Sequence, residues 1–355
     1  MPDKNFLFDL LGTPSPSGWE ADGQRLWIRH LRNIADAVEA DAYGNAWATL
    51  DGTGGGNLRV LIEAHADEIG FIVRHIDAKG FLSLAPIGWS DRTIAAARRI
   101  RIFGDRGEVP GVIGNNAIHL RDTGKDKVPE WKDLFADVGA SSAAAVEALG
   151  IRVGHPAIYC DEAVELSSGR LIGRAIDNRI SGFLLAEILS ALARDPTRPY
   201  ATTIAANAIQ EEIGHHGARM IAHRLKPHVA VVFDVTHATD TPGLEAREHG
   251  LVELGKGPTL SHGAANHPLV VKRLLEVAQL EEIPVQHEAI SCSTRTDADA
   301  IYTALDGVPS ALVSIPMRYM HSPTETVDLV DADRAARLVA GFVRSLRPED
   351  AFQTI

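Results

Sequence analysis

The chain has few cysteines: among its 355 residues only Cys160 and Cys292 carry a thiol. Two cysteines cannot form a disulfide framework, and these two are not the close pair that a thiolate zinc site uses. A metal bound by this chain must therefore be held by histidine and carboxylate side chains. We expect both cysteines to be small, buried residues.

Long hydrophobic runs are also absent. No apolar stretch approaches the roughly 20 residues that a membrane span requires, so we expect no membrane partner. Residues 1–10 contain neither the basic segment nor the uninterrupted apolar segment of a secretory signal, which predicts a cytoplasmic location. Hydrophobic residues make up 45% and charged residues 23% of the chain, values ordinary for a soluble globular protein.

Positive charge is in short supply. The formal net charge is -12, which argues against a nucleic-acid surface and is compatible with binding cations through clustered carboxylates. The glycine-rich segment 51–57 is not followed by Gly-Lys-Ser or Gly-Lys-Thr, and a strand pattern follows it instead of a helix pattern. We therefore interpret it as a turn and not as a phosphate-binding loop.

The order of predicted elements indicates an α/β fold with an insertion. Helix-like periodicity in the first 40 residues precedes a buried strand at 58–64. Short β-like pieces punctuated by glycine and proline follow over 69–113, as in a small all-β unit. From residue 171 strands and helices alternate. The length predicts roughly two domains at about 150 residues each, with an insertion of about 95 residues inside a larger α/β domain.

Two adjacent carboxylates, Glu211 and Glu212, follow a predicted strand at 201–209. In an open α/β sheet, ligands bind at the carboxyl ends of the strands. Adjacent side chains of an extended segment point to opposite faces, so the two glutamates can have different roles only if the chain turns, which Gly214 and Gly217 permit. An acidic pair favoured by the dipole of a helix start is the simpler alternative.

Other predicted strand ends offer further metal-type ligands. They deliver His65 and Asp67, Asp177, Asp234, and His321. A lone histidine is more often a satisfied surface or core residue, and a lone aspartate at a strand end is more often a helix cap. Ligand-type residues at five strand ends are hard to ascribe to capping, because histidine is a poor cap. Together they predict a metal site.

Seven motifs also carry a resemblance to a known family. In chain order they are His65-Ala-Asp-Glu-Ile-Gly-Phe71, Ala175-Ile-Asp-Asn-Arg179, Gln210-Glu-Glu-Ile-Gly214, Asp234-Val-Thr-His-Ala238 with Asp240-Thr-Pro-Gly243, Gly255-Lys-Gly-Pro258, Thr296-Asp-Ala298 and Arg318-Tyr-Met-His-Ser-Pro323. In sequence and spacing they resemble the glutamyl and tetrahedral aminopeptidases, which are cocatalytic dinuclear metallopeptidases (clan MH, metallopeptidase family forty-two). The resemblance covers nearly the whole chain.

The resemblance implies a site with two divalent ions, zinc or cobalt. His65 and Asp234 would hold one ion, and Glu212 and His321 would hold the other. Asp177 would bridge the two ions. Imidazole and carboxylate ligands suit these metals, and a bridging carboxylate suits ions about 3.5–4 Å apart.

The same resemblance assigns roles to two further carboxylates. Glu211 would be the general base, which takes a proton from the metal-activated water and returns it to the leaving amine. Asp67 would orient His65, since a ligating imidazole usually donates its second N–H to a carboxylate.

For the fold, the resemblance implies a mixed-sheet, three-layer αβα metallopeptidase domain made of residues 1–67 and 166–355. Residues 68–165 would be an inserted PDZ-like β-domain that narrows access and helps assembly. Relatives commonly form tetrahedral dodecamers around a chamber that admits peptides. We therefore expect a homo-oligomer that acts on short peptides.

Four positions depart from the family pattern, and the first is Ala66, where relatives often have methionine, a change that should cost little. His215 and His216 occupy positions where a non-histidine pair is more usual. Because the ligand set is already full, we expect them to be surface or pocket-wall histidines. Arg295 lies where glycine is usual, and it either alters the pocket near the amino end of the substrate or faces solvent.

The leading hypothesis is a metal-dependent aminopeptidase. A deacylase or dipeptidase on the same dinuclear scaffold is an alternative, and so is a non-catalytic peptide-binding or assembly protein. A cellulase is chemically disfavoured, because glycosidases need paired carboxylates that flank the sugar bond, whereas here the carboxylates are committed to metal. Acidic, basic and neutral specificities all occur on this scaffold.

Overall fold

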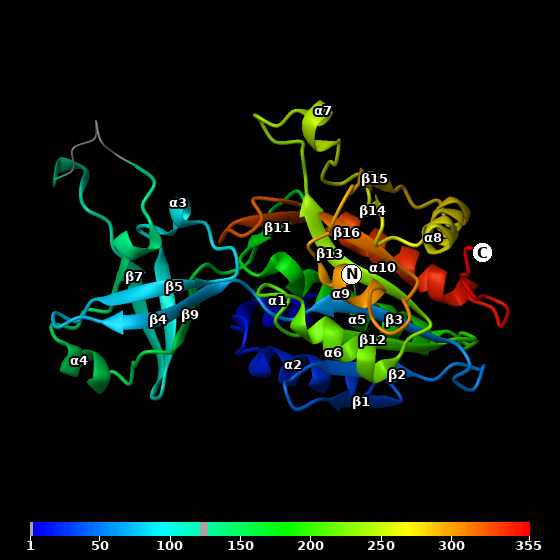
Figure 1. Ribbon diagram of the computed structural model, residues 1–355, viewed down its shortest axis with the longest axis horizontal. Coiled ribbons are helices and arrows are strands. Elements are labelled where there is room, and N and C mark those ends of the chain that lie inside the picture. The colour runs from blue at the N-terminus through cyan, green and yellow to red at the C-terminus, as the bar shows by residue number, and fades with distance from the viewer. Residues whose placement is uncertain (1–2, 121–126) are drawn as a thin grey trace.

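A computed structural model describes residues 3–120 and 127–355. Figure 1 shows two parts, a large α/β part on the right and a smaller β-rich part on the left. The large part is built on an 11-stranded sheet, and the small part is a closed β-barrel. The predicted α/β class is therefore confirmed, and the sheet is mixed.

The large sheet has parallel strands at its centre and antiparallel strands at its edges. Its strands are β1 (Ala37–Ala40), β2 (Ala46–Leu50), β3 (Arg59–His65), β10 (Val164–Glu165), β11 (Arg170–Gly173), β12 (Thr202–Ala208), β13 (Val229–His237), β14 (Thr259–His262), β15 (Gln286–Ala289), β16 (Ser310–Arg318) and β17 (Glu325–Asp328). The hydrogen-bonded order is β1-β2-β12-β3-β13-β16-β17-β11-β10, and β14 pairs with both β15 and β16. The central strands β12, β3, β13 and β16 are parallel, so their carboxyl ends meet at one edge.

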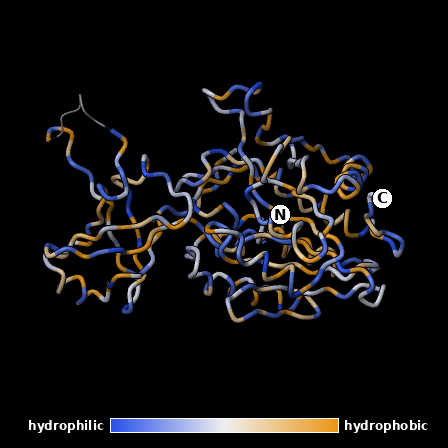
Figure 2. The backbone as a smooth tube through the Cα atoms, viewed as in Figure 1, coloured by the Kyte–Doolittle hydropathy of each residue, from blue (hydrophilic) through white to orange (hydrophobic). Residues whose placement is uncertain are grey.

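Helices cover both faces of this sheet and complete three layers. One face carries α1 (Lys4–Gly12), α2 (Ala21–Leu31), α5 (Ile176–Arg194), α8 (Pro268–Leu280) and α10 (Leu329–Ser345), and the other carries α6 (His216–Leu225) and α9 (Asp297–Tyr302). Strands covered on both faces read as continuous apolar runs. In β3, for example, Val60 belongs to one core and its neighbour Leu61 to the other. Figure 2 shows hydrophobic residues concentrated in this central layer.

The smaller part is a barrel of six strands with its own core. The strands are β4 (Gly70–Ile76), β5 (Leu82–Ile87), β6 (Arg99–Gly104), β7 (Gly107–Ile113), β8 (Phe135–Asp137) and β9 (Pro156–Tyr159). Short helical segments flank them: α3 (Arg92–Ala95), η1 (Ile118–Leu120), η3 (Trp131–Asp133) and α4 (Ala143–Ala148). Inward-facing Ile100 and Ile102 pack with Phe71 and Tyr159, whose rings meet edge to face 5.1 Å apart. A barrel thus occupies the region where the sequence predicts a small all-β unit.

Two expectations from the sequence are wrong in detail. Asp234 does not follow the end of its strand, because β13 continues to His237 by pairing with β16 as far as Met317. Cys292 is exposed and Cys160 is partly buried, so neither is the fully buried residue we expected. The first difference arises because strand length is set by the neighbouring strand, which a local pattern does not contain.

The short helix α7 (Ala246–His249) lies on a segment that projects from the sheet beyond β13. Within the described residues, every helix is too short or too polar to span a bilayer.

The start of α6 depends on the absence of a side chain at Gly217. A Cβ there would collide with the backbone of Ile209 and with the side-chain oxygen of Asn45. We expect Gly217→Ala to lower the free energy of unfolding by about 1–3 kcal/mol, as overpacking usually does. Gly12→Ala is the matched control, because a Cβ at Gly12 has open space around it. Thermal or urea denaturation that finds the two variants equally stable would contradict this account of the α6 start.

Candidate metal centre

The five predicted ligands come from separate elements and meet at the carboxyl edge of the central strands. His65 ends β3, Asp177 lies in the first turn of α5, Glu212 follows β12, Asp234 lies within β13, and His321 follows β16. Their ligand atoms form two groups, each with all atoms within 4.8 Å of one another. The first group is His65, Asp177 and Asp234, and the second is Asp177, Glu212 and His321. Asp177 is common to both.

Asp177 faces the two groups with different oxygens. Its Oδ1 lies 3.2 Å from His65 Nε2, and its Oδ2 lies 3.5 Å from His321 Nε2. Asp234 Oδ1 is 3.9 Å from His65 Nε2, and Glu212 Oε2 is 3.3 Å from His321 Nε2. A carboxylate that bridges two cations must present one oxygen to each side, as Asp177 does here.

The cluster gathers negative charge in a buried place. Asp177 Oδ1 is buried and, although His65 Nε2 lies 3.2 Å away, it accepts no well-aligned hydrogen bond within the described part of the chain. Burial, reinforced by the nearby charge of Asp177, raises the pKa of Glu212 to about 7. Burial also raises the pKa of Asp234 well above its usual range. Glu212 and Asp234 thus resist carrying negative charge, whereas contacts with His321 and His65 outweigh burial and lower the pKa of Asp177 below its usual range.

The histidines respond in the opposite direction. Burial on its own would lower the pKa of His321, but its contacts with Asp177 and Glu212 raise that pKa to about 11. In the same way, the surrounding carboxylates raise the pKa of His65 well above its usual range in spite of burial. The raised pKa values of both imidazoles reflect the negative potential that the carboxylates create in the cluster. A divalent cation would balance the same charge, and this imidazole and carboxylate set fits zinc or cobalt.

Asp67 fastens the loop that carries the two glutamates. Its Oδ1 accepts a hydrogen bond from the backbone N–H of Glu211 at 3.0 Å, and its Oδ2 accepts from that of Glu212 at 3.2 Å. The Ser17 hydroxyl donates to the same Oδ2 at 2.6 Å. His65 Nδ1 lies 3.2 Å from the Asp67 carbonyl oxygen and 3.5 Å from the Asp67 carboxylate. Asp67 therefore contacts His65 more closely through its backbone than through its side chain.

Glu325 is a buried carboxylate that the sequence reasoning missed. Its Oε1 accepts a hydrogen bond from the backbone N–H of His321 at 3.1 Å, and its Oε2 accepts from that of Asp177 at 3.0 Å. The Glu325 side chain thus fixes the backbone of two predicted ligands, Asp177 and His321, which come from different segments of the chain. The signal that could have found it is its place four residues after His321, just beyond the motif that ends at Pro323.

The barrel also contributes to the site. The carbonyl oxygen of Trp89 lies 3.2 Å from His321 Nδ1, and a Cβ at the preceding Gly88 would lie 3.2 Å from Glu212 Oε2. The loop after β5 therefore packs directly on two of the predicted ligands. No local pattern in the sequence indicates these contacts, because the contact between Trp89 and His321 joins residues 232 positions apart and Gly88 is also far from Glu212 in the chain.

Glu211 lies beside the cluster with its two oxygens in different surroundings. Its Oε2 is 3.9 Å from His65 Nε2, facing the predicted ligands. Its Oε1 is 3.1 Å from His215 Nε2, and this hydrogen bond raises the pKa of His215. His215 lines the cavity, whereas His216 is exposed at the start of α6.

The chain matches the family model described as M42 glutamyl aminopeptidase over residues 44–338. The chain belongs to the M42 family. This M42 protein is 34% identical over 355 residues to the lysyl aminopeptidase of Pyrococcus furiosus, a comparison that covers 99% of each chain. Since the family is hydrolytic and its named relatives are aminopeptidases, the protein is a hydrolase of the aminopeptidase class.

Solved structures agree with this assignment. An aminopeptidase from the archaeon Desulfurococcus kamchatkensis is similar with a TM-score of 0.92 and 34% identity, over 99% of this chain and 96% of that chain. The TET1 peptidase of Pyrococcus horikoshii is similar with a TM-score of 0.86 and 27% identity, over 96% of this chain and 99% of that chain. The mixed-sheet α/β fold of the M42 protein is therefore shared with solved aminopeptidases.

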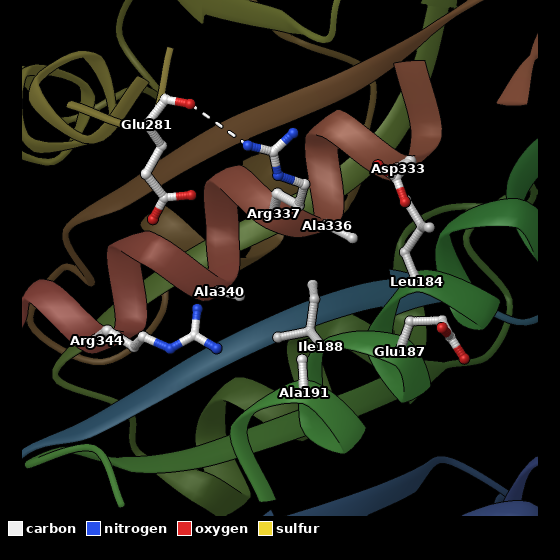
Figure 3. A pocket seen from close by; sticks show the side chains of 10 residues that line it. All are labelled: Leu184, Glu187, Ile188, Ala191, Glu281, Asp333, Ala336, Arg337, Ala340 and Arg344. Atoms are coloured by element: carbon white, nitrogen blue, oxygen red, sulfur yellow. Dashed lines mark hydrogen bonds between the residues drawn. The ribbon is translucent and has the colours of Figure 1, made fainter. Parts of the chain in front are cut away.

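The predicted ligands line a cavity of about 790 Å³. Trp89 of the barrel and Arg295 of the segment before α9 also line it, and Arg295 is exposed. A separate hollow of about 300 Å³ lies between α5 and α10 (Figure 3). None of the predicted site residues lines that second hollow. The predicted metal ligands and Glu211 of this M42 protein therefore belong to the larger of these two cavities.

The raised pKa of His321 makes a prediction about metal loading. A ligating imidazole must be neutral, so a divalent ion that enters the cluster has to displace the proton that His321 holds up to a pH of about 11. We expect Zn²⁺ binding to metal-free protein at pH 8 to release protons. Isothermal titration in two buffers of different ionisation enthalpy measures this release.

The controls separate the cluster from other histidines. His321→Gln should release fewer protons and bind fewer ions than the unchanged protein. His223→Gln, which alters an exposed histidine of α6, should behave like the unchanged protein. A binding heat that is independent of the buffer would contradict the protonated state that we infer for the cluster.

Proposed function

We propose that this M42 protein is a two-metal aminopeptidase that removes N-terminal residues from short peptides. The observation that carries the proposal is the position of Asp177 between two three-residue groups, one oxygen toward each, with Glu211 beside them. His65 and Asp234 would hold one ion, Glu212 and His321 would hold the other, and Asp177 would be shared between the two groups. The ions are zinc or cobalt, which the donor set supports.

Two ions in this cluster would lower the pKa of a shared water and polarise the scissile carbonyl. Glu211 acts as the general base, because its Oε2 faces the cluster while His215 holds its Oε1. It takes the proton of the water and delivers it to the amine of the leaving peptide. Asp67 keeps Glu211 in place through the backbone N–H of that residue, and it limits the rotation of His65.

We also propose a division of labour along the chain. Residues 1–67 and 166–355 form the catalytic domain, and residues 68–165 form a PDZ-like domain that narrows access to the site. The contact between Trp89 and His321 supports a role of the barrel at the entrance. Strand β10 pairs with β11 in the large sheet, so the last residues of the insert already belong to the sheet.

The proposed enzyme works as a homo-oligomer, and we favour a tetrahedral dodecamer. Support comes from the similar TET1 peptidase of Pyrococcus horikoshii, which can assemble into a tetrahedron or a large octahedral shell. Both thiols are free, as is usual in a reducing compartment, and we propose that the enzyme acts in the cytoplasm.

The role of Glu211 can be tested by an isosteric change. Glu211→Gln should retain both ions and lower kcat by about 100-fold or more, the usual effect of removing a general base. Asp177→Ala, in contrast, should lose at least one ion. Elemental analysis and aminoacyl-p-nitroanilide turnover measure the two effects, with Glu248→Gln on exposed α7 as the control. A fully active Glu211→Gln variant would overturn the mechanism.

The need for a free amino end distinguishes an aminopeptidase from a deacylase. Peptides with a free N-terminus should lose one residue at a time, and mass spectrometry should show a ladder of shortened products. The same peptides with an N-acetyl group should remain uncut. Efficient cleavage of the acetylated peptides would favour the deacylase instead.

A further inference from the structure

The cavity extends beyond the predicted metal ligands and Glu211 to a further carboxylate, that of Glu288 in β15. The Thr236 hydroxyl donates to its Oε1 at 2.8 Å, and the Ser261 hydroxyl donates to its Oε2 at 3.1 Å. Both hydrogen bonds come from neutral groups and fix the carboxylate without neutralising its charge. None of the roles proposed above uses Glu288, although it lines the same cavity.

The distance of Glu288 from the cluster suits a long side chain. Asp234 and Thr236 lie two residues apart in β13, so they point to the same face at a spacing of roughly 7 Å. The Glu288 carboxylate lies one hydrogen bond, 2.8 Å, beyond the Thr236 hydroxyl. When the scissile carbonyl is at the cluster, the flexible four-carbon stem of lysine or the longer arginine side chain can reach this carboxylate, and a leucine side chain cannot.

The lining of the cavity that holds the cluster and Glu288 fits such a side chain. Ile290, Leu312 and Met320 give the cavity apolar wall, against which the methylenes of a basic side chain can pack. Ser314 also lines the cavity, and its hydroxyl is buried without a hydrogen-bond partner in the described part of the chain. Apolar walls that lead to a fixed anion are what a cationic side chain requires.

Arg295 is the charge that could oppose this preference. It is exposed, and its backbone N–H is held by Asp299 and Ser293 while its side chain lies in solvent at the cavity. Exposed charges are screened by water and salt, whereas a partly buried carboxylate acts through a lower dielectric. The fixed carboxylate of Glu288 therefore outweighs the exposed guanidinium of Arg295.

We propose that Glu288 is the residue that reads the N-terminal side chain of the substrate, and that the preferred peptides begin with lysine or arginine. This inference rests on the proposed function, since it takes the scissile bond to lie at the metal cluster. Glu288 forms a charge-assisted hydrogen bond with the ammonium or guanidinium group and takes no part in the proton transfer.

The test uses the metal-loaded enzyme with the p-nitroanilides of lysine, arginine, leucine and glutamate. The unchanged enzyme should prefer the two basic substrates. Glu288→Gln should lower kcat/KM for the lysine substrate by about 10- to 100-fold, as expected for the loss of a hydrogen bond to a charged group. The loss should appear mainly in KM, and kcat/KM for the leucine substrate should stay within about threefold, because the bonds that react are untouched.

Two further variants sharpen the result. Glu288→Asp keeps the charge but withdraws it by one methylene, so it should recover activity on the arginine substrate more than on the lysine substrate. Arg295→Gly should change the ratio of lysine to leucine turnover less than Glu288→Gln does. A ratio that is unchanged in Glu288→Gln, or one that depends on Arg295 instead, would overturn the inference.

The outcomes also separate this inference from the proposed function. An enzyme that cleaves leucine or glutamate substrates as well as basic ones, with Glu288→Gln without effect, refutes the role of Glu288 and leaves the aminopeptidase intact. A correctly folded, metal-loaded enzyme that cleaves none of the four substrates refutes the proposed function and the inference together.

Discussion

Mutual repulsion among buried carboxylates at one edge of the sheet is the constraint on which the rest of the site depends. Asp177, Glu212 and Asp234 come together where burial already disfavours their charge, and the pKa values of His65 and His321 are raised by these neighbours. Such a cluster is stable only if positive charge, from protons or a metal ion, compensates the carboxylates and if the surrounding backbone cannot relax. Asp67 and Glu325 meet the second condition, because each accepts hydrogen bonds from the backbone of two residues that carry the cluster or the neighbouring base.

Much of the gathering of these residues could be predicted from the sequence, because each predicted ligand lies within a short motif beside a strand. His65 and Asp67 illustrate this, because His65 is the last residue of β3 and Asp67 follows two residues later. The alternation of strands and helices could also be predicted from local sequence patterns, because apolar runs and glycines mark where these elements begin. The large sheet then brings the motifs together by pairing parallel strands, so predicting the strands was nearly enough to predict the gathering of the ligands.

The parts that escaped prediction depend on contacts between distant segments. Ser17 reaches Asp67 across 50 positions, and the Trp89 carbonyl reaches His321 across 232. The position of Asp234 inside β13 was missed because the partner strand β16 prolongs β13. Glu288 also escaped prediction, because the two hydroxyl groups that fix its carboxylate come from other strands, Thr236 from β13 and Ser261 from β14.

The loop of Gly88 and Trp89 connects the barrel to the chemistry of the sheet. Its carbonyl oxygen contacts the ring nitrogen of His321 that faces away from the cluster, and its glycine leaves room for Glu212. If the barrel tilted away, His321 would lose this contact and would be free to rotate about its side-chain bonds. His321 thus keeps its orientation only while the barrel stays in contact with the large sheet. A change that loosens this junction would therefore impair the site without altering any residue of the sheet.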